Sequence, residues 1–100
     1  MFDEIIKVAE TYGIKTVILF GSRAKGTETI ESDIDICVIA ETDNKRRLAS
    51  ALQVSIECEI PIDIIVYTPC EWEECIKDDT SFAKKILSEG RILYGQPKIS

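Results

Sequence analysis

The chain has 100 residues, of which 45% are hydrophobic, and it carries a formal net charge of −6. This length and composition predict one folded domain over residues 1–100 and exclude a disordered tail. The negative charge argues against a duplex nucleic-acid binder, which needs a basic face, and the longest apolar runs are too short to span a bilayer. Because the N-terminus has no signal-peptide pattern, we expect a soluble cytoplasmic protein.

The histidine and cysteine content excludes several kinds of site. The chain has no histidine, which removes the commonest general base and any Ser-His or Cys-His nucleophile scheme. Its cysteines show no CxxC spacing, which argues against a zinc site and predicts free thiols in a reducing compartment. They are Cys37, Cys58, Cys70 and Cys75. We expect the first two to be buried as small apolar residues.

The N-terminal part predicts a helix followed by two strands. Apolar residues at helical spacing indicate the helix: Phe2, Ile5, Ile6 and Ala9. Gly13 can end it, and a short buried strand follows over Thr16–Phe20. Gly21 ends this strand abruptly, and a short helical turn is expected to begin at Ser22. The segment Ile34–Ala40 is apolar on both faces, which predicts a central strand of a sheet.

The middle of the chain predicts a second long helix and a third strand. The helix is expected from Asp43 to about Glu59, and the strand over Ile62–Tyr67, with Pro61 between them. The apolar stripe of this helix consists of Leu48, Leu52 and Ile56. The basic run Lys45–Arg47 fits an exposed first turn of the same helix.

The C-terminal part predicts two more helices and a closing strand. The segment TPCE, residues 68–71, fits a helix start with Thr68 as N-cap in a capping box. A last helix is expected from about Ser81 to Glu89, with Gly90 as its cap and a short strand over Arg91–Tyr94. Its inward-facing residues are expected to be Phe82, Ile86 and Leu87. Because strands alternate with helices, the class is α/β, or α+β with a mixed sheet.

Three aspartates are candidate metal ligands. Side chains alternate along a strand, so Asp33 and Asp35 point the same way. Asp63 is a lone charge in an apolar strand, where an aspartate is costly unless it is paired or metal-bound. If the expected strands Ile34–Ala40 and Ile62–Tyr67 are adjacent, the three carboxylates converge, and Mg²⁺ would relieve their repulsion. Taken singly, each also fits a turn, either one in which Ser32 bonds the backbone or one set by Pro61.

Gly21 and Ser22 form a candidate phosphate-binding turn. Glycine lets the backbone approach a ligand, and amide groups at a helix start bind anions together with a serine hydroxyl. Arg23 and Lys25 add positive charge, and an exposed helical turn would also explain these two residues. The segment lacks the GxxxxGK[ST] pattern, so it is not a Walker A loop, and a plain tight turn is the alternative.

The segment GSRAKGTETIESDID resembles the signature of the DNA polymerase β-type nucleotidyltransferase superfamily: Gly-Ser, ten residues, then Asp-x-Asp. Its GSRAxG beginning and SDID ending are similar to those of minimal nucleotidyltransferases, and the resemblance extends over nearly the whole chain. It implies a small mixed β-sheet flanked by helices. It also implies that the Gly-Ser turn holds the phosphates of ATP and that aspartates bind two Mg²⁺ ions. The matching residues are Gly21, Ser22, Asp33, Asp35 and Asp63.

The same resemblance implies an acceptor. We expect no room for a separate acceptor-binding domain, and minimal nucleotidyltransferases commonly pair with a HEPN-type ribonuclease toxin, acting as antitoxins that transfer AMP to a toxin tyrosine. In that scheme Asp63 either accepts the proton of the attacking hydroxyl or orients it through a metal. Two alternatives stay open: a non-catalytic nucleotide-binding interaction module, and a small-molecule adenylyltransferase formed across a homodimer. Trp72 is expected to pack in the core rather than in a partner interface.

Overall fold

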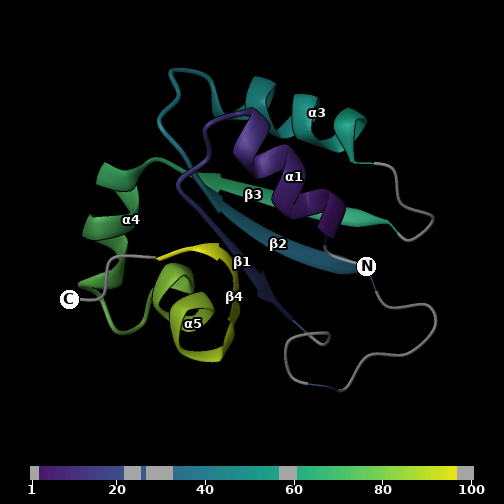
Figure 1. Cartoon of the computed structure of the whole chain (residues 1–100). Coiled ribbons are helices and arrows are strands. Elements are labelled where there is room, and N and C mark those ends of the chain that lie inside the picture. The colour runs from purple at the N-terminus through teal and green to yellow at the C-terminus, as the bar shows by residue number, and fades with distance from the viewer. Residues whose placement is uncertain (1–2, 22–25, 27–32, 57–60, 97–100) are drawn as a thin grey trace.

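The structure is a computed structural model that describes residues 3–21, 26, 33–56 and 61–96 (Figure 1). Its helices are α1 (Asp3–Thr11), α3 (Lys45–Ser55), α4 (Pro69–Ile76) and α5 (Phe82–Glu89). Its strands are β1 (Thr16–Phe20), β2 (Ile34–Ile39), β3 (Ile62–Tyr67) and β4 (Arg91–Gly95). No helix within these ranges is long and apolar enough to cross a membrane.

The four strands form one mixed sheet in the order β3-β2-β1-β4. β1 runs antiparallel to both β2 and β4, whereas β2 and β3 are parallel. The central place of β2 is therefore confirmed, as is the α/β class with a mixed sheet. The register pairs Phe20 with Asp35 and Asp35 with Asp63, so three strands bring these residues to one end of the sheet.

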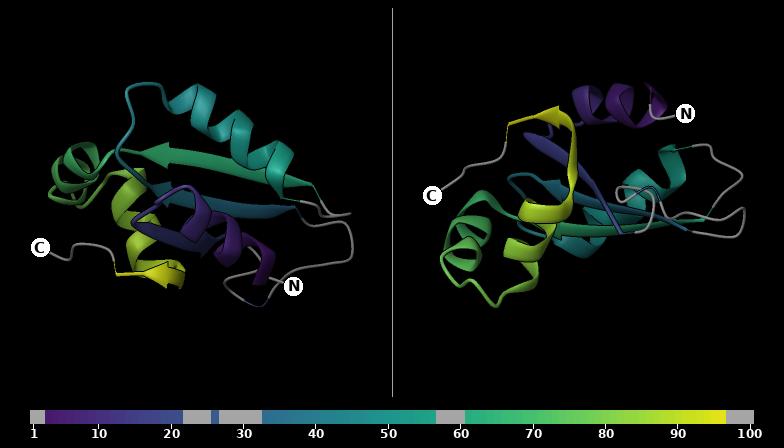
Figure 2. Two further views of the ribbon diagram at one scale, coloured as in Figure 1. Left: turned by 45° about the horizontal axis from the view of Figure 1, so that its top comes forward. Right: turned by 90° about the horizontal axis from the view of Figure 1, so that it is seen from below.

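Helices cover both faces of the sheet (Figures 1 and 2). α1 and α3 pack on one face, and α4 and α5 pack on the other. Alternate residues of β2, namely Ile34, Ile36 and Val38, point into the first core and are at most 3% exposed. Ile5 of α1 and Leu52 of α3 belong to the same cluster, as their helical spacing predicted.

The core under α4 and α5 is smaller. Trp72 of α4 is 1% exposed, and its ring meets that of Tyr67 edge to face, with centroids 5.5 Å apart. Ile86 of α5 and Cys37 of β2 belong to the same cluster. Burial raises the pKa of the Cys37 thiol to about 12. The predictions that Trp72 packs in the core and that Cys37 is a buried apolar residue are both confirmed.

Local sequence signals set several helix boundaries. Thr68 caps α4, because its Oγ1 accepts a hydrogen bond from the backbone N–H of Glu71 at 3.2 Å. The Glu71 carboxylate accepts in return from the backbone N–H of Thr68 at 3.1 Å, which completes the predicted capping box. α1 ends before Gly13, whose φ of +66° suits the end of a helix.

Some details of the sequence-based prediction were wrong. The helix expected from Asp43 begins at Lys45, because the Asn44 side chain accepts from the backbone N–H of Arg47 and caps it. Phe82, expected to face inward, is 49% exposed, because the buried position in the first turn of α5 belongs to Ala83.

Candidate active site

Three strands bring the candidate site to one end of the sheet (Figure 1). Asp35 is the second residue of β2 and lies in register with Asp63, the second residue of β3. Gly21 follows Phe20, which ends β1 and pairs with Asp35 from the other side. Side chains alternate along a strand, so Asp35 shares the α4–α5 face of the sheet with Cys37. The adjacency of β2 and β3, on which the expected convergence of carboxylates depended, is confirmed.

Asp35 experiences the charge of both other aspartates. Its carboxyl is half-buried, and its pKa is raised first by burial, then by the charge of Asp63 and then by that of Asp33. The charges of Asp63 and Asp33 therefore both repel the partly desolvated carboxylate of Asp35. A divalent cation would replace that repulsion with attraction, and carboxylate oxygens are the ligands that Mg²⁺ prefers in proteins.

Gly21 lies directly against the Asp35 carboxylate. Its φ is +77°, a conformation that residues with a side chain rarely adopt. A Cβ at this position would collide with Oδ2 of Asp35 and would stand 3.2 Å from its Cγ. Glycine is required here both by the turn and by the room that the carboxylate occupies. A glycine with a left-handed backbone fits a phosphate-binding turn, in which the backbone must come close to the ligand.

The other two aspartates are exposed. Asp63 is exposed rather than buried, and it lies near the start of β3, whereas α4 begins directly after the other end of that strand. Asp33, directly before β2, is exposed as well. In the described part of the chain, no three His, Cys, Asp or Glu side chains are grouped closely enough to hold a metal ion. The fit to Mg²⁺ therefore rests on the donor type and on the strand register, not on a closed cage.

Part of the predicted phosphate site cannot be placed. Ser22, Arg23 and Lys25 lie outside the described residues, as does the helical turn expected to begin at Ser22. Gly21 is the described member of that predicted set, and its backbone conformation fits the expected turn. The phosphate-binding role of all four residues stays a prediction.

A hollow of about 170 Å³ adjoins Gly21, and it was not expected from the sequence. It is lined by Phe20, Gly21, Phe82, Lys85, Ile86 and Glu89. The rings of Phe20 and Phe82 meet edge to face, with centroids 5.6 Å apart. The helical spacing of Phe82, Lys85 and Glu89 could have indicated it, because it marks a stripe of α5 distinct from the buried stripe.

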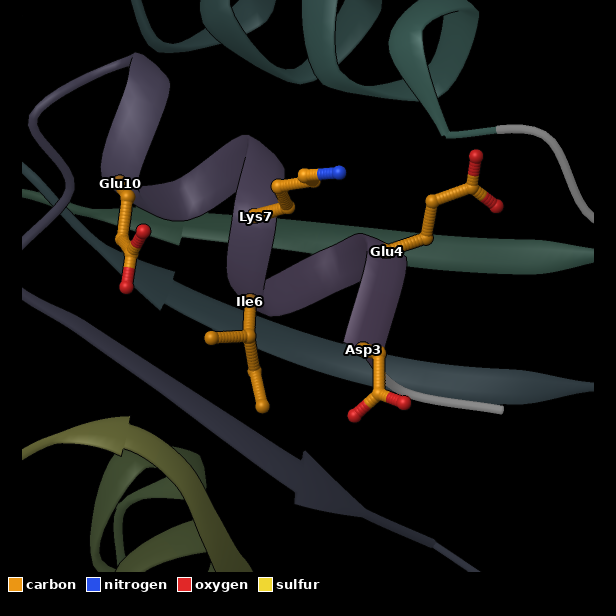
Figure 3. A pocket seen from close by; sticks show the side chains of 5 residues that line it. All are labelled: Asp3, Glu4, Ile6, Lys7 and Glu10. Atoms are coloured by element: carbon orange, nitrogen blue, oxygen red, sulfur yellow. The ribbon is translucent and has the colours of Figure 1, made fainter.

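A wider hollow of about 580 Å³ runs along α1 (Figure 3). The described residues that line it all belong to this helix: Asp3, Glu4, Ile6, Lys7 and Glu10. In Figure 3, Asp3, Ile6 and Glu10 extend on one side of the helix, and Glu4 and Lys7 on another. Since α1 packs on the sheet face opposite to Asp35, this surface is separate from the candidate active site.

Comparison with known proteins connects this geometry to a family. The family described as polymerase beta, nucleotidyltransferase matches residues 3–99. A protein of Methanocaldococcus jannaschii, named as a candidate protein adenylyltransferase, is 39% identical over 83 residues, which cover 81% of this chain and 79% of that protein.

Solved structures share the fold. A toxin–antitoxin structure with AMP-PNP has a TM-score of 0.62 at 25% identity and covers 94% of this chain and 73% of its own. A candidate nucleotidyltransferase from Sulfolobus solfataricus has a TM-score of 0.61 at 22% identity, covering 96% and 78%. A mutant of the toxin–antitoxin MntA-HpeT has a TM-score of 0.60 at 21% identity, covering 96% and 74%. Because the family match spans nearly the whole chain, this protein is a nucleotidyltransferase and belongs to the polymerase beta nucleotidyltransferase family.

Proposed function

We propose that this chain transfers AMP from ATP to a tyrosine hydroxyl of a HEPN-type toxin and so acts as its antitoxin. The observation that carries the proposal is the register of the sheet, which aligns Asp35 with Asp63 while Gly21 lies against Asp35. Two comparisons support it: the relative at 39% identity is named for protein adenylylation, and a toxin–antitoxin structure with AMP-PNP shares the fold.

Asp33, Asp35 and Asp63 would hold Mg²⁺, with two ions as the family resemblance implies. When bound, Mg²⁺ supplies positive charge that neutralises the triphosphate and stabilises the departing pyrophosphate. The exposure of Asp33 and Asp63 leaves this end of the sheet accessible to an acceptor as large as a second protein.

The reaction forms one phosphorus–oxygen bond and breaks another. The tyrosine oxygen attacks the α-phosphorus of ATP, and the bond from that phosphorus to the oxygen shared with the β-phosphate breaks, releasing pyrophosphate. Gly21 and Ser22 hold the phosphates, and Arg23 and Lys25 add positive charge. A carboxylate oxygen of Asp63 accepts the hydroxyl proton, or Asp63 would hold a metal ion that orients the hydroxyl. Such transfers need positioning and charge stabilisation more than covalent help, so the absence of histidine is no obstacle.

The test is AMP labelling of the purified partner toxin by this protein with ATP and Mg²⁺. The toxin to use is the HEPN-type protein of a neighbouring reading frame. We expect a mass increase of one AMP on the toxin, located on a tyrosine by peptide mapping and abolished by EDTA. Asp33→Asn and Asp35→Asn should each stop labelling, whereas Glu10→Gln, on the α1 surface, should not. Intact labelling by both aspartate variants would refute the proposal.

Other outcomes would identify the alternatives. Release of pyrophosphate without any protein partner would indicate a small-molecule adenylyltransferase. Neutralisation of the toxin with no change in its mass, and with Asp35→Asn as effective as the unchanged protein, would indicate an interaction module that acts by contact alone.

A further inference from the structure

The hollow beside Gly21 has no role in the transfer chemistry described above. Its lining residues include the aromatic Phe20 and Phe82, the aliphatic Ile86 and the basic Lys85. We propose that this hollow binds the base of the nucleoside triphosphate, with the ring of Phe82 as the stacking surface. This inference rests on the proposed function, because it names where that nucleotide is held.

The order of the strands gives each reactant a side of the site. Asp63 on β3, Asp35 on β2 and Gly21 after β1 follow one another across the sheet. The hollow lies beyond Gly21 and is lined by α5, which packs on β1 (Figure 1). Phosphates held at the Gly21 turn, next to Asp35, leave the acceptor to approach at Asp63. The rest of the nucleotide then extends toward α5.

The hollow and the carboxylates also share one face of the sheet. Phe20 lines the hollow and is the cross-strand partner of Asp35, so both side chains lie on the α4–α5 face. An acceptor tyrosine seated in the hollow would have its oxygen on the wrong side of Gly21 for attack near Asp63. The geometry therefore favours the base over the acceptor as occupant.

The lining suits a flat heteroaromatic ring. Phe82 is the first residue of α5 and keeps 49% of its surface exposed, and its ring stands at 87° to that of Phe20. An exposed ring next to a phosphate turn offers a stacking surface, and every nucleobase has a flat face that can stack on it. The Lys85 ammonium group is a donor for the ring nitrogens and carbonyl oxygens that bases carry.

Inorganic tripolyphosphate has no base, so comparing its binding with that of ATP distinguishes contacts to the base from contacts to the phosphates. Binding of ATP and of tripolyphosphate, each with Mg²⁺, is measured by calorimetry for the unchanged protein and for Phe82→Ala, Phe82→Leu and Phe82→Tyr. We expect Phe82→Ala to weaken ATP binding roughly tenfold to a hundredfold, the usual effect of losing one stacking ring, and to leave tripolyphosphate binding unchanged. Phe82→Leu keeps apolar contact with Phe20 without a flat ring and should also weaken ATP binding. Phe82→Tyr should restore it.

A matched control uses Tyr12, whose ring is 44% exposed and whose hydroxyl hydrogen-bonds Ser55 on α3, away from the hollow. Tyr12→Ala should change neither affinity, and a thermal melt of each variant checks that it folds. In the labelling assay, Phe82→Ala should raise the KM for ATP and leave kcat close to its original value.

Each contrary outcome is distinct. If the unchanged protein binds ATP no more tightly than tripolyphosphate, the base pocket is wrong and the proposed transfer stands. Full ATP affinity in Phe82→Ala, or an equal loss of both ligands, also overturns the inference. If the unchanged protein binds neither ligand, the proposed function fails and the base pocket fails with it.

Discussion

The two faces of β2 differ in how far helices cover them. Ile34 and Ile36 point toward α1 and α3 and are at most 1% exposed, whereas Asp35 between them points to the other face and is only half-buried. Farther along the strand the second face closes too, since Cys37 and Ile39 are at most 4% exposed under α4 and α5. One face is therefore sealed along the whole strand, and the other only over its far part.

Helix length and placement explain this difference. α4 begins directly after β3, and its Trp72 packs on Tyr67, so it covers the end of the sheet opposite to Asp35. An eight-residue helix is about 12 Å long, whereas a six-residue strand spans about 20 Å, so α4 is too short to cover β2 and β3 along their length. Substitutions on the sealed face should therefore change stability, and those at the uncovered end should change activity.

The sealed face should give the largest effect on folding. Ile36→Ala removes a side chain that is 1% exposed and should lower the free energy of unfolding by about 2–5 kcal/mol. For a domain of this size that corresponds to a fall in melting temperature of roughly 10–30 °C, measured by circular dichroism. Ile36→Val is the matched control, with an expected loss of about 0.5–1.5 kcal/mol. An unchanged melting temperature in Ile36→Ala would contradict the comparison of faces.

A substitution at the uncovered end should change the rate of AMP transfer rather than the stability of the fold. Asp35→Asn should lower the rate of AMP transfer on the order of 10²–10³-fold, the usual effect of losing a group that stabilises transition-state charge. Stability should not fall, because burial and two like charges raise the pKa of Asp35 in the folded state. The ionised carboxylate thus opposes folding at neutral pH, an effect that disappears as the pH falls through the folded-state pKa. A lower melting temperature for this variant in EDTA would show that Asp35 is structural.

Much of the fold could be predicted because its signals are local. β1 and β3 have the expected bounds, and the capping box of α4 is formed by residues three apart in sequence. Gly90 shows the limit of such reasoning. It caps α5 as expected, but its φ is −78°, so glycine is needed for space instead: a Cβ would stand 2.5 Å from the carbonyl oxygen of Ile86 and 2.5 Å from Cγ2 of Ile18. The contact with Ile18 is tertiary and leaves no local signal.

The candidate site likewise has features that could be predicted from the sequence and features that could not. The shared face of Asp35 and Asp63 could be predicted, because alternation along a strand fixes where each side chain points. The exposure of Asp63 and of Phe82 could not, because it depends on how much of the sheet α4 and α5 cover. Sequence periodicity shows which stripe of a helix is apolar, but not where that helix ends over its sheet.

Gly21→Ala, at the uncovered end, should have a smaller effect on folding than Ile36→Ala. An alanine in the left-handed conformation costs about 1–2 kcal/mol. Its Cβ would also push the Asp35 carboxylate aside, and a displacement of that kind can lower the transfer rate about 10²-fold. Gly26 is a matched control, because its φ is +75° and a Cβ there would meet nothing within 4 Å.

The two glycine variants distinguish backbone strain in the turn from displacement of the Asp35 carboxylate. Both should lose similar stability in chemical denaturation, but Gly21→Ala alone should lose AMP transfer. Equal loss of transfer in both variants would mean that turn strain, and not the position of the Asp35 carboxylate, limits the reaction.

The smallest effect is expected at the far, covered end of the same face. Thr68→Ala removes the side-chain acceptor for the backbone N–H of Glu71 and should cost about 1 kcal/mol, while Thr68→Ser keeps the hydroxyl and should cost less. Hydrogen exchange should quicken in α4 more than in α3, because the cap acts on the first turn of α4 and the two helices pack on opposite faces of the sheet. AMP transfer below the melting temperature should not change, since α4 does not reach Asp35 and Asp63. A rate that falls in Thr68→Ala as far as it does in Gly21→Ala would show that the two ends of this face are coupled, and the separation of a stabilising end from a reacting end would then be wrong.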